Sequence, residues 1–234
     1  MITEGLKQLI KWASATFGIE IIFIIKDEIE SQWRKYFIGR NVLILGPKGT
    51  GKSSLLWYLQ HKKPFIEKDG EIITPDPTAM VIITDVKYEP QKKNWIKIKE
   101  DLPGDEALRE TWKIAIEEIN PHGIIYMIDG RSDKAVESVI QELWDNVLVH
   151  YHNRPRALST LHIFVNFADL WAKDRVITFH KLSNIKVHFF EKIKNNQFLE
   201  HLRIDVHETQ LSPTKKEWSE TKRAIDKFGS DMSS

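Results

Sequence analysis

The feature that most constrains this chain is a glycine-rich octapeptide that lies between an apolar run and an amphipathic segment. It reads Gly46-Pro47-Lys48-Gly49-Thr50-Gly51-Lys52-Ser53 and fits the pattern GxxxxGK[ST]. The preceding residues 41–45 predict a short buried strand, and the periodic residues 53–60 predict a helix. Glycines in this setting let successive backbone amides point at phosphate oxygens, and the helix N-terminus adds partial positive charge. The octapeptide therefore predicts a phosphate-binding P-loop.

Three side chains of this segment have expected roles in holding a nucleotide. Lys52 would bridge the β- and γ-phosphates, and the Ser53 hydroxyl would ligate Mg²⁺. Ser54 follows in the first helical turn and completes the set of expected nucleotide contacts. The alternative interpretation, a glycine turn that contains a lysine by accident, is disfavoured by the strand-to-helix context. The P-loop alone does not identify the base, because ATPases and kinases share it.

The rest of the chain alternates between strand and helix patterns. Strands are expected at 79–88, 95–99, 123–128, 161–165 and 202–206, and helices at about 106–120, from 133, at 176–194 and at 212–229. The first two strands, joined by a short turn, resemble a hairpin. This order predicts an α/β fold of the P-loop NTPase kind: a mainly parallel six-stranded sheet with one antiparallel edge strand and helices on both faces.

A candidate metal-side carboxylate follows the strand at 95–99. Asp101-Leu102-Pro103-Gly104 would place Asp101 near the magnesium ion and the Gly104 amide near a γ-phosphate. DxxG alone is a weak signal, and a second copy, Asp226-Lys227-Phe228-Gly229, falls within the last expected helix. The position directly after a strand favours the first copy as the functional one.

A candidate base-reading carboxylate follows the strand at 161–165, in Asn166-Phe167-Ala168-Asp169. The Asp169 carboxylate could accept hydrogen bonds from guanine N1–H and the 2-amino group, whereas adenine offers neither donor. A buried carboxylate without its partner is costly, so such a site can discriminate by about 10⁴-fold. The alternative is that Asn166 ends a strand and Asp169 caps the next turn. We interpret the segment as favouring GTP and GDP.

Composition limits which binding partners and which cellular compartment are expected. The chain has 34 Lys and Arg against 33 Asp and Glu, so no global field attracts nucleic acid, and nucleic-acid binding is not expected. It contains no cysteine, which excludes disulfides, thiolate nucleophiles and Cys-based zinc sites. A cytoplasmic location is the default expectation.

Residues 1–40 leave three interpretations open. Apolar residues recur at helical spacing up to Phe17, and residues 19–25 are apolar apart from Glu20. The segment could form helices packed on the domain or on a partner, or lie in the plane of a membrane surface as an amphipathic anchor. A true span is disfavoured, because it needs about 20 apolar residues and this run carries Lys11 and Glu20. The location is therefore expected to be cytoplasmic, with peripheral membrane contact as an option.

The order of these motifs resembles the five guanine-nucleotide loops of the Ras-like small GTPases. The P-loop is followed by Pro77-Thr78, by DLPG, by NFAD and by Val206-His207-Glu208-Thr209-Gln210. DLPG with Arg109 and Trp112-Lys113 is similar to switch II of the Arf family, and DLPG with Glu106 and Leu108-Arg109 also resembles the β-subunit of the signal recognition particle receptor. The resemblance implies a G domain at 41–229, an N-terminal extension at 1–40 and a flexible tail at 230–234.

The resemblance also implies roles for individual residues. Thr78, with Thr74 as the alternative, would supply the switch I hydroxyl to Mg²⁺ and its amide to the γ-phosphate. Gly104 would supply the switch II amide. Asn166 and Asp169 would contact the base, and Glu208-Thr209 would form the last loop beneath it. Such a switch is expected to bind protein effectors and an activating or exchange partner.

Three departures from the family pattern bear on turnover and on base binding. Asp105 stands where the family commonly has a glutamine that orients water, and a carboxylate there is repelled by the γ-phosphate. Lys48 stands where a small residue is usual, and Phe167 replaces a lysine whose stem lies along the guanine. We therefore expect slow or partner-dependent hydrolysis. The alternatives are a pseudo-GTPase that holds GTP as a structural ligand and an ATP-using P-loop enzyme.

Overall fold

The computed structural model describes residues 40–61, 67–68, 71–72, 82–88, 96–101, 110–151, 158–172, 174–193, 199, 201–211 and 218–233. The chain divides into two units, and all the described residues belong to the second, Arg40–Ser234. The expectations for the first 39 residues lie outside the described part. The same is true of Thr74, Thr78 and residues 102–109.

The described residues contain a helix or strand near each position at which the sequence predicts one. In chain order they are β1 (Arg40–Leu45), α3 (Lys52–His61), β2 (Glu67–Lys68), β3 (Glu71–Ile72), β4 (Ile82–Tyr88), β5 (Ile96–Asp101), α4 (Glu110–Ile119), β6 (Gly123–Asp129), α5 (Asp133–Asn146), the 3₁₀ helix η3 (Leu148–Tyr151), β7 (Thr160–Asn166), α6 (Ala168–Trp171), α7 (Arg175–Ile193), β8 (Arg203–Glu208) and α8 (Ser219–Ser233). Among these helices, none is both long and apolar enough to cross a membrane.

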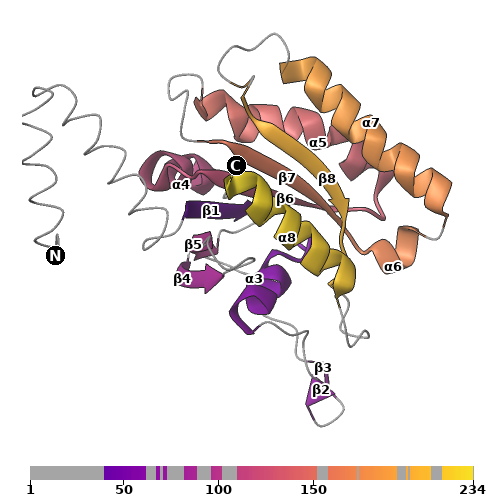
Figure 1. Cartoon of the computed structure of the whole chain (residues 1–234), viewed down its shortest axis with the longest axis horizontal. Coiled ribbons are helices and arrows are strands. Elements are labelled where there is room, and N and C mark those ends of the chain that lie inside the picture. Colours follow the sequence, from indigo (N-terminus) through magenta and orange to yellow (C-terminus); the bar gives the residue numbers. More distant parts are fainter. Residues whose placement is uncertain are drawn as a thin grey trace, which may run out of the picture. The chain divides into compact units, whose positions relative to one another are not determined.

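The main sheet has the strand order β4-β5-β1-β6-β7-β8 (Figure 1). β5, β1, β6, β7 and β8 pair in parallel, and β4 pairs with β5 in the antiparallel sense. β2 and β3 form a separate two-stranded ladder. The expected α/β fold with a parallel sheet and helices is confirmed. Because parallel strands end at the same edge of a sheet, the loops that follow β1, β6, β7 and β8 gather at that edge.

The sheet is covered on both faces, and its strands are buried accordingly. Alternate residues of one strand enter different cores, as the two-residue period of a strand requires. Leu43, Tyr126 and Ile163 belong to the core under α4, α5 and α7, whereas Ile44 and Met127 belong to the core under α3 and α8. Nearly continuous apolar runs such as that of β6 are typical of parallel strands buried on both faces.

The last helix is longer than the sequence suggests. The expected end at Gly229, followed by a flexible tail from residue 230, is wrong, because α8 continues to Ser233. Met232 is 2% exposed and belongs to the core under α8. A Cβ atom at Gly123 would lie only 2.7 Å from both Phe228 Cζ and Met232 Sδ. A glycine at the start of β6 thus lets this last turn pack directly on the sheet, and the packing outweighs the local tendency of Gly229 to end a helix.

Candidate nucleotide-binding site

The P-loop joins β1 to α3 through a backbone that depends on glycine. Gly46, Gly49 and Gly51 have φ angles of 141°, 79° and 97°, which L-residues with side chains rarely adopt. A Cβ atom at Gly46 would also collide with the carbonyl oxygen of Met127 in β6. Three such positions within six residues make the backbone curl at the N-terminus of α3. This is the geometry with which backbone amides surround a phosphate.

Lys52 lies beneath this loop with its ammonium group directed at the loop backbone. Its side chain is buried, and Nζ donates hydrogen bonds to the carbonyl oxygens of Gly46 at 2.8 Å and Pro47 at 2.9 Å. Thr50 Oγ1 donates to the same Pro47 carbonyl at 2.9 Å. The ammonium is therefore fixed at the P-loop, where the sequence places a phosphate-bridging lysine. Lys48, by contrast, is exposed at the tip of the loop.

The expected metal ligands are partly described. Ser53 and Ser54 lie in the first turn of α3, and both are partly buried. Asp101 is the last residue of β5 and pairs with Ile44, near the end of β1 that leads into the P-loop. A hydroxyl and a carboxylate are oxygen ligands of the kind that Mg²⁺ prefers. These two elements therefore bring Ser53 and Asp101 to the same edge of the sheet as the P-loop, and the donor set fits magnesium.

Asn166 joins the loop after β7 to the P-loop. Its side chain is fully buried, and its Nδ2 donates to the Thr50 carbonyl oxygen at 2.9 Å, across 116 positions of sequence. A Cβ atom at Gly51 would come within 2.5 Å of that nitrogen, so the contact is tight. The prediction that Asn166 belongs to the site with the P-loop is supported. In this structure its amide nitrogen holds the phosphate loop in place.

Asp169 carries a buried carboxylate oxygen that is available as a hydrogen-bond acceptor. Its Oδ1 is buried and has no hydrogen-bond partner among the described residues. A buried acceptor without a donor costs about 1 to 3 kcal/mol, so such an atom indicates a ligand that supplies one. Asp169 lies in the short helix α6, directly after Phe167, whose φ of 63° and ψ of 36° are left-handed. The local chain turns sharply here and brings α6 to the end of β7.

The loop that contains Thr209 is hydrogen-bonded to the loop that contains Asp169. The Ala168 amide donates to the Thr209 carbonyl oxygen at 3.0 Å, and the Thr209 amide donates to the Val165 carbonyl oxygen at 3.0 Å. Thr209 is fully buried, and its Oγ1 has no partner within the described part of the chain. Thr209 therefore lies beside the loop that carries Asn166 and Asp169, where the resemblance places the last base-binding loop.

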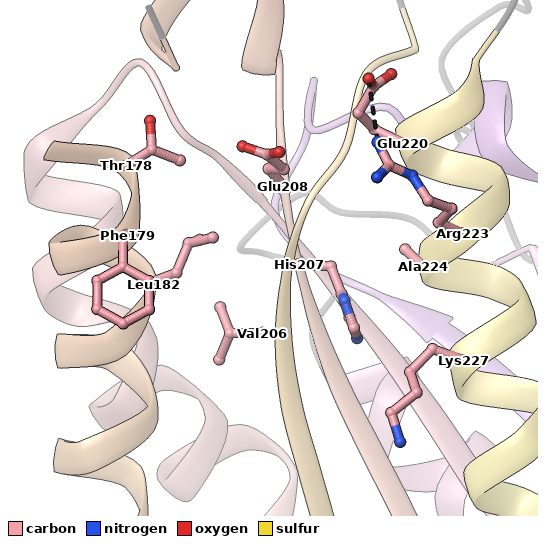
Figure 2. Close-up of a pocket in the computed structure, with 10 residues that line it drawn as sticks. All are labelled: Thr178, Phe179, Leu182, Val206, His207, Glu208, Glu220, Arg223, Ala224 and Lys227. Atoms are coloured by element: carbon pink, nitrogen blue, oxygen red, sulfur yellow. Dashed lines mark hydrogen bonds and ion pairs between the residues drawn. The ribbon is translucent and has the colours of Figure 1, made fainter. Parts of the chain in front are cut away.

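Glu208 lines a hollow that contains no P-loop residue. It lines a hollow of about 480 Å³ along the free edge of β8, between α7 and α8 (Figure 2). Phe179 and Leu182 of α7 and Arg223 and Lys227 of α8 contribute to the same lining. No P-loop residue contributes, so this hollow is separate from the phosphate site. The expectation that the Glu208 side chain serves the nucleotide gains no support.

Arg131 is a member of the site that the sequence reasoning missed. Its guanidinium carbon lies 3.9 Å from the centroid of the Phe167 ring. Its Nε and Nη2 donate to the two carboxylate oxygens of Asp129 at 2.9 and 2.7 Å. The signal that could have revealed it is an acidic residue at the end of the strand 123–129 with an arginine two positions later. In such a pair the arginine can donate hydrogen bonds to the carboxylate, which holds the arginine near the end of the next strand.

Electrostatics keeps this pair charged. Burial raises the pKa of Asp129, but the hydrogen bonds and the charge of Arg131 outweigh burial, and the pKa lies below its ordinary value. The hydrogen bond to Asp129 raises the pKa of Arg131 above its ordinary value against a smaller effect of burial, and the charges of Asp129 and Asp169 add to it. The negative charge of Asp169 thus acts on the same guanidinium that covers Phe167.

Solved structures share this fold. The chain resembles the mammalian signal recognition particle receptor (TM-score 0.55, 16% identity, 81% of this chain and 100% of that chain). It also resembles the SRb-GTP/SRX complex of that receptor from Chaetomium thermophilum (TM-score 0.53, 16% identity, 82% of this chain and 99% of that chain). A third similar structure is the Arl6 BBS3 small GTPase from Trypanosoma brucei with bound GppNp (TM-score 0.52, 12% identity, 83% of this chain and 97% of that chain). At these identities the likeness establishes the fold, which is that of the small GTPases.

The comparison of sequences identifies the family. No curated protein sequence matches the chain. The family model of the signal recognition particle receptor beta subunit matches residues 38–171, which is more than half of the 234 residues. The matched span runs from β1 through the P-loop to α6, and so it contains Asn166 and Asp169 as well. The resemblance inferred from the motifs is therefore confirmed, and the chain belongs to the family of the signal recognition particle receptor β-subunit, within the Ras-like and Arf-like small GTPases.

Proposed function

We propose that this chain is a GTP- and GDP-binding molecular switch. The observation that carries the proposal is the hydrogen bond from Asn166 Nδ2 to the Thr50 carbonyl oxygen, because it joins the phosphate loop and the base-reading loop in one site. The site lies in the unit Arg40–Ser234, and in this proposal the residues before it serve as an N-terminal extension. The similar structure from Chaetomium thermophilum is an SRb-GTP/SRX complex, which supports both GTP and a protein partner for this chain.

The described residues divide the recognition of GTP between them. The P-loop amides and the Lys52 ammonium bind the β- and γ-phosphates. Asp169 Oδ1 accepts a hydrogen bond from guanine, which satisfies its buried and unpartnered oxygen. Thr209 closes the site beneath the base through its hydrogen bonds to the loop of Asp169. This arrangement selects guanine by supplying an acceptor that adenine cannot satisfy.

Magnesium has a matching set of ligands in this proposal. Ser53 and Asp101 would hold it, together with Thr78 from the region outside the described residues. When bound, the ion neutralises charge on the phosphates. Gly104 would contact the γ-phosphate by its amide, so that residues 101–113 and the region of Thr78 differ between the GTP and GDP states. These regions are the surfaces that effectors and an activating or exchange partner would recognise.

Hydrolysis is expected to be slow without a partner. Asp105 cannot orient and activate water as the family glutamine does, and the exposed Lys48 occupies the tip of the P-loop. Even with the glutamine present, intrinsic rates are about 10⁻⁴ s⁻¹. The exposed lysine equally favours a second candidate, a pseudo-GTPase that holds GTP as a structural ligand. Single-turnover hydrolysis with and without partner proteins separates the two, since only the switch is accelerated.

We place the protein in the cytoplasm, with a membrane surface as a site of peripheral contact through residues 1–40, and we expect no nucleic-acid partner. Balanced charge supports the last point. Vesicle flotation of the full chain tests the peripheral membrane contact: binding that requires residues 1–40 supports it, and no binding to any vesicle refutes it.

The decisive test of the proposed function is nucleotide competition. Protein stripped with EDTA is titrated with a fluorescent guanine nucleotide in the presence of magnesium and competed with GTP, GDP and ATP. We expect GTP and GDP to compete at least about a hundredfold better than ATP, a gap of about 2.7 kcal/mol. Asp169→Asn should shift the preference from guanine to xanthine nucleotides. Equal competition by ATP would refute guanine recognition and favour an ATP-binding P-loop protein.

A further inference from the structure

The base-binding loop has an aromatic ring where the family pattern has a lysine, and that ring is not isolated. The Phe167 side chain is partly buried, and one of its faces is covered by the Arg131 guanidinium at 3.9 Å. A cation within about 6 Å of a ring centroid is attracted to the face of the ring. The contact therefore restricts how the ring can turn, and a base that stacks on this ring has to use the face opposite the guanidinium.

The guanidinium that makes this contact is itself held in place. Arg131 Nε and Nη2 donate to Asp129 at 2.9 and 2.7 Å, and the Arg131 amide donates to Asp129 Oδ1 at 2.9 Å. Asp129 is the last residue of β6 and pairs in register with Asn166, the last residue of β7. Arg131 and Phe167 thus follow two paired strand ends. The sheet itself sets their separation.

The backbone that carries the ring is also constrained. Phe167 adopts a left-handed conformation, which is unusual for a bulky residue and persists only where its surroundings impose it. The Asn166 carbonyl accepts hydrogen bonds from the Gly130 amide at 3.2 Å and from Trp171 Nε1 at 2.7 Å. The Leu170 amide donates to the Phe167 carbonyl at 2.9 Å. With the backbone fixed on both sides, the side-chain torsions are the remaining freedom of the ring, and Arg131 limits them.

We propose that Arg131 is a positioning residue that orients the Phe167 ring as the stacking platform for the nucleotide base. The inference rests on the proposed GTP-binding function and deepens it. Stacking on an aromatic ring is tolerant of base identity, because every base has a π-face. The Arg131–Phe167 pair therefore sets affinity for guanine, inosine and xanthine nucleotides alike, while Asp169 sets the preference among them.

The experiment measures GDP and IDP affinities of the full chain and its variants by fluorescence competition with magnesium. Arg131→Ala should weaken both nucleotides by about threefold to tenfold, the range of a cation–π contact. IDP lacks the 2-amino group of GDP, so the ratio of the two affinities reports the Asp169 contact. That ratio should stay at its wild-type value. Arg131→Lys, which keeps the charge without the planar fork, should recover part of the loss.

Repeating the Arg131→Ala substitution in a Phe167→Lys variant separates the positioning role of Arg131 from a general loss of stability. Phe167→Lys installs the family's usual residue and removes the ring, so adding Arg131→Ala there should change GDP affinity by less than about twofold. Arg223→Ala is the matched control, because Arg223 is an exposed arginine of α8 paired with Glu220 at 3.4 Å, and its loss should leave binding unchanged.

Three results would overturn the inference: wild-type affinity in Arg131→Ala, an equal loss in the Phe167→Lys background, or a changed ratio of GDP to IDP affinity. A wild-type chain that binds no guanine nucleotide would refute the proposed function and this inference with it. A wild-type chain that binds GDP while Arg131→Ala binds it equally well refutes only the inference.

Discussion

Asn166→Ala tests the hydrogen bond that joins the base-reading loop to the P-loop. The substitution removes a fully buried donor at 2.9 Å from the Thr50 carbonyl oxygen. Leaving a buried polar group without its partner costs about 1 to 3 kcal/mol. For a domain of this size, each kcal/mol lowers the melting temperature by about 2 to 4 °C, so we expect a decrease of about 2 to 12 °C. Thermal and urea unfolding, followed by circular dichroism, measure this loss.

Nucleotide affinity gives the second readout of the same variant. Because the bond holds the P-loop against the base-reading loop, GDP affinity should fall too, by up to about 100-fold if the whole penalty appears in the bound state. Asn41→Ala is the matched control: Asn41 Nδ2 donates to the Ile119 carbonyl oxygen at 3.2 Å, in a half-buried contact across 78 positions. This control should lose some stability and retain wild-type GDP affinity. Unchanged stability and affinity in Asn166→Ala would refute the reasoning.

Two further perturbations follow from the geometry. Gly46→Ala should abolish GDP binding, because its Cβ would collide with the Met127 carbonyl oxygen in addition to the strain of its positive φ. Gly49→Ala carries the strain of a φ of 79°, but apart from its chain neighbours no described atom lies within 4 Å of its Cβ, so it should lose less; equal losses in the two would contradict this. Burial and, to a smaller extent, the charge of His207 lower the pKa of His162 to about 3. The unfolded chain then binds more protons than the folded one between about pH 3 and 6.5, so the free energy of unfolding should fall as pH decreases, by up to about 1.4 kcal/mol per unit. Urea titrations of His162→Gln should show a flatter dependence, and an unchanged slope would contradict the assignment.

Most of the phosphate site was predictable, because its signals are local. Strand, glycine loop and helix succeed one another within about 20 residues, and the positive φ of Gly46 and Gly51 is the reason that glycine stands there. Asn166 and Asp169 were predictable because they follow a strand that was visible as an apolar run. Thr209 was expected only from the resemblance to the small GTPases, and the structure places it directly after β8.

The contacts between loops were not predictable in the same way. The Arg131–Phe167 contact spans 36 positions and exists because Asp129 and Asn166 end paired strands in register, which no local pattern encodes. The resemblance places Glu208 in the last loop beneath the base, and the structure places it at the end of β8, in the lining of the hollow between α7 and α8. A residue at a strand end can face either way, and the pleat of the strand decides which.

The sequence by itself determined the class of fold and the identity of the phosphate-binding loop, because apolar periodicity and glycine spacing act over a few residues. Tertiary structure decided which groups meet. It set the bond from Asn166 to Thr50, the cation over Phe167, and the extension of α8 to Ser233 over Gly123. Each depends on strand register and on close approach between distant segments, and these arise from the packing of the whole sheet rather than from any one stretch of the chain.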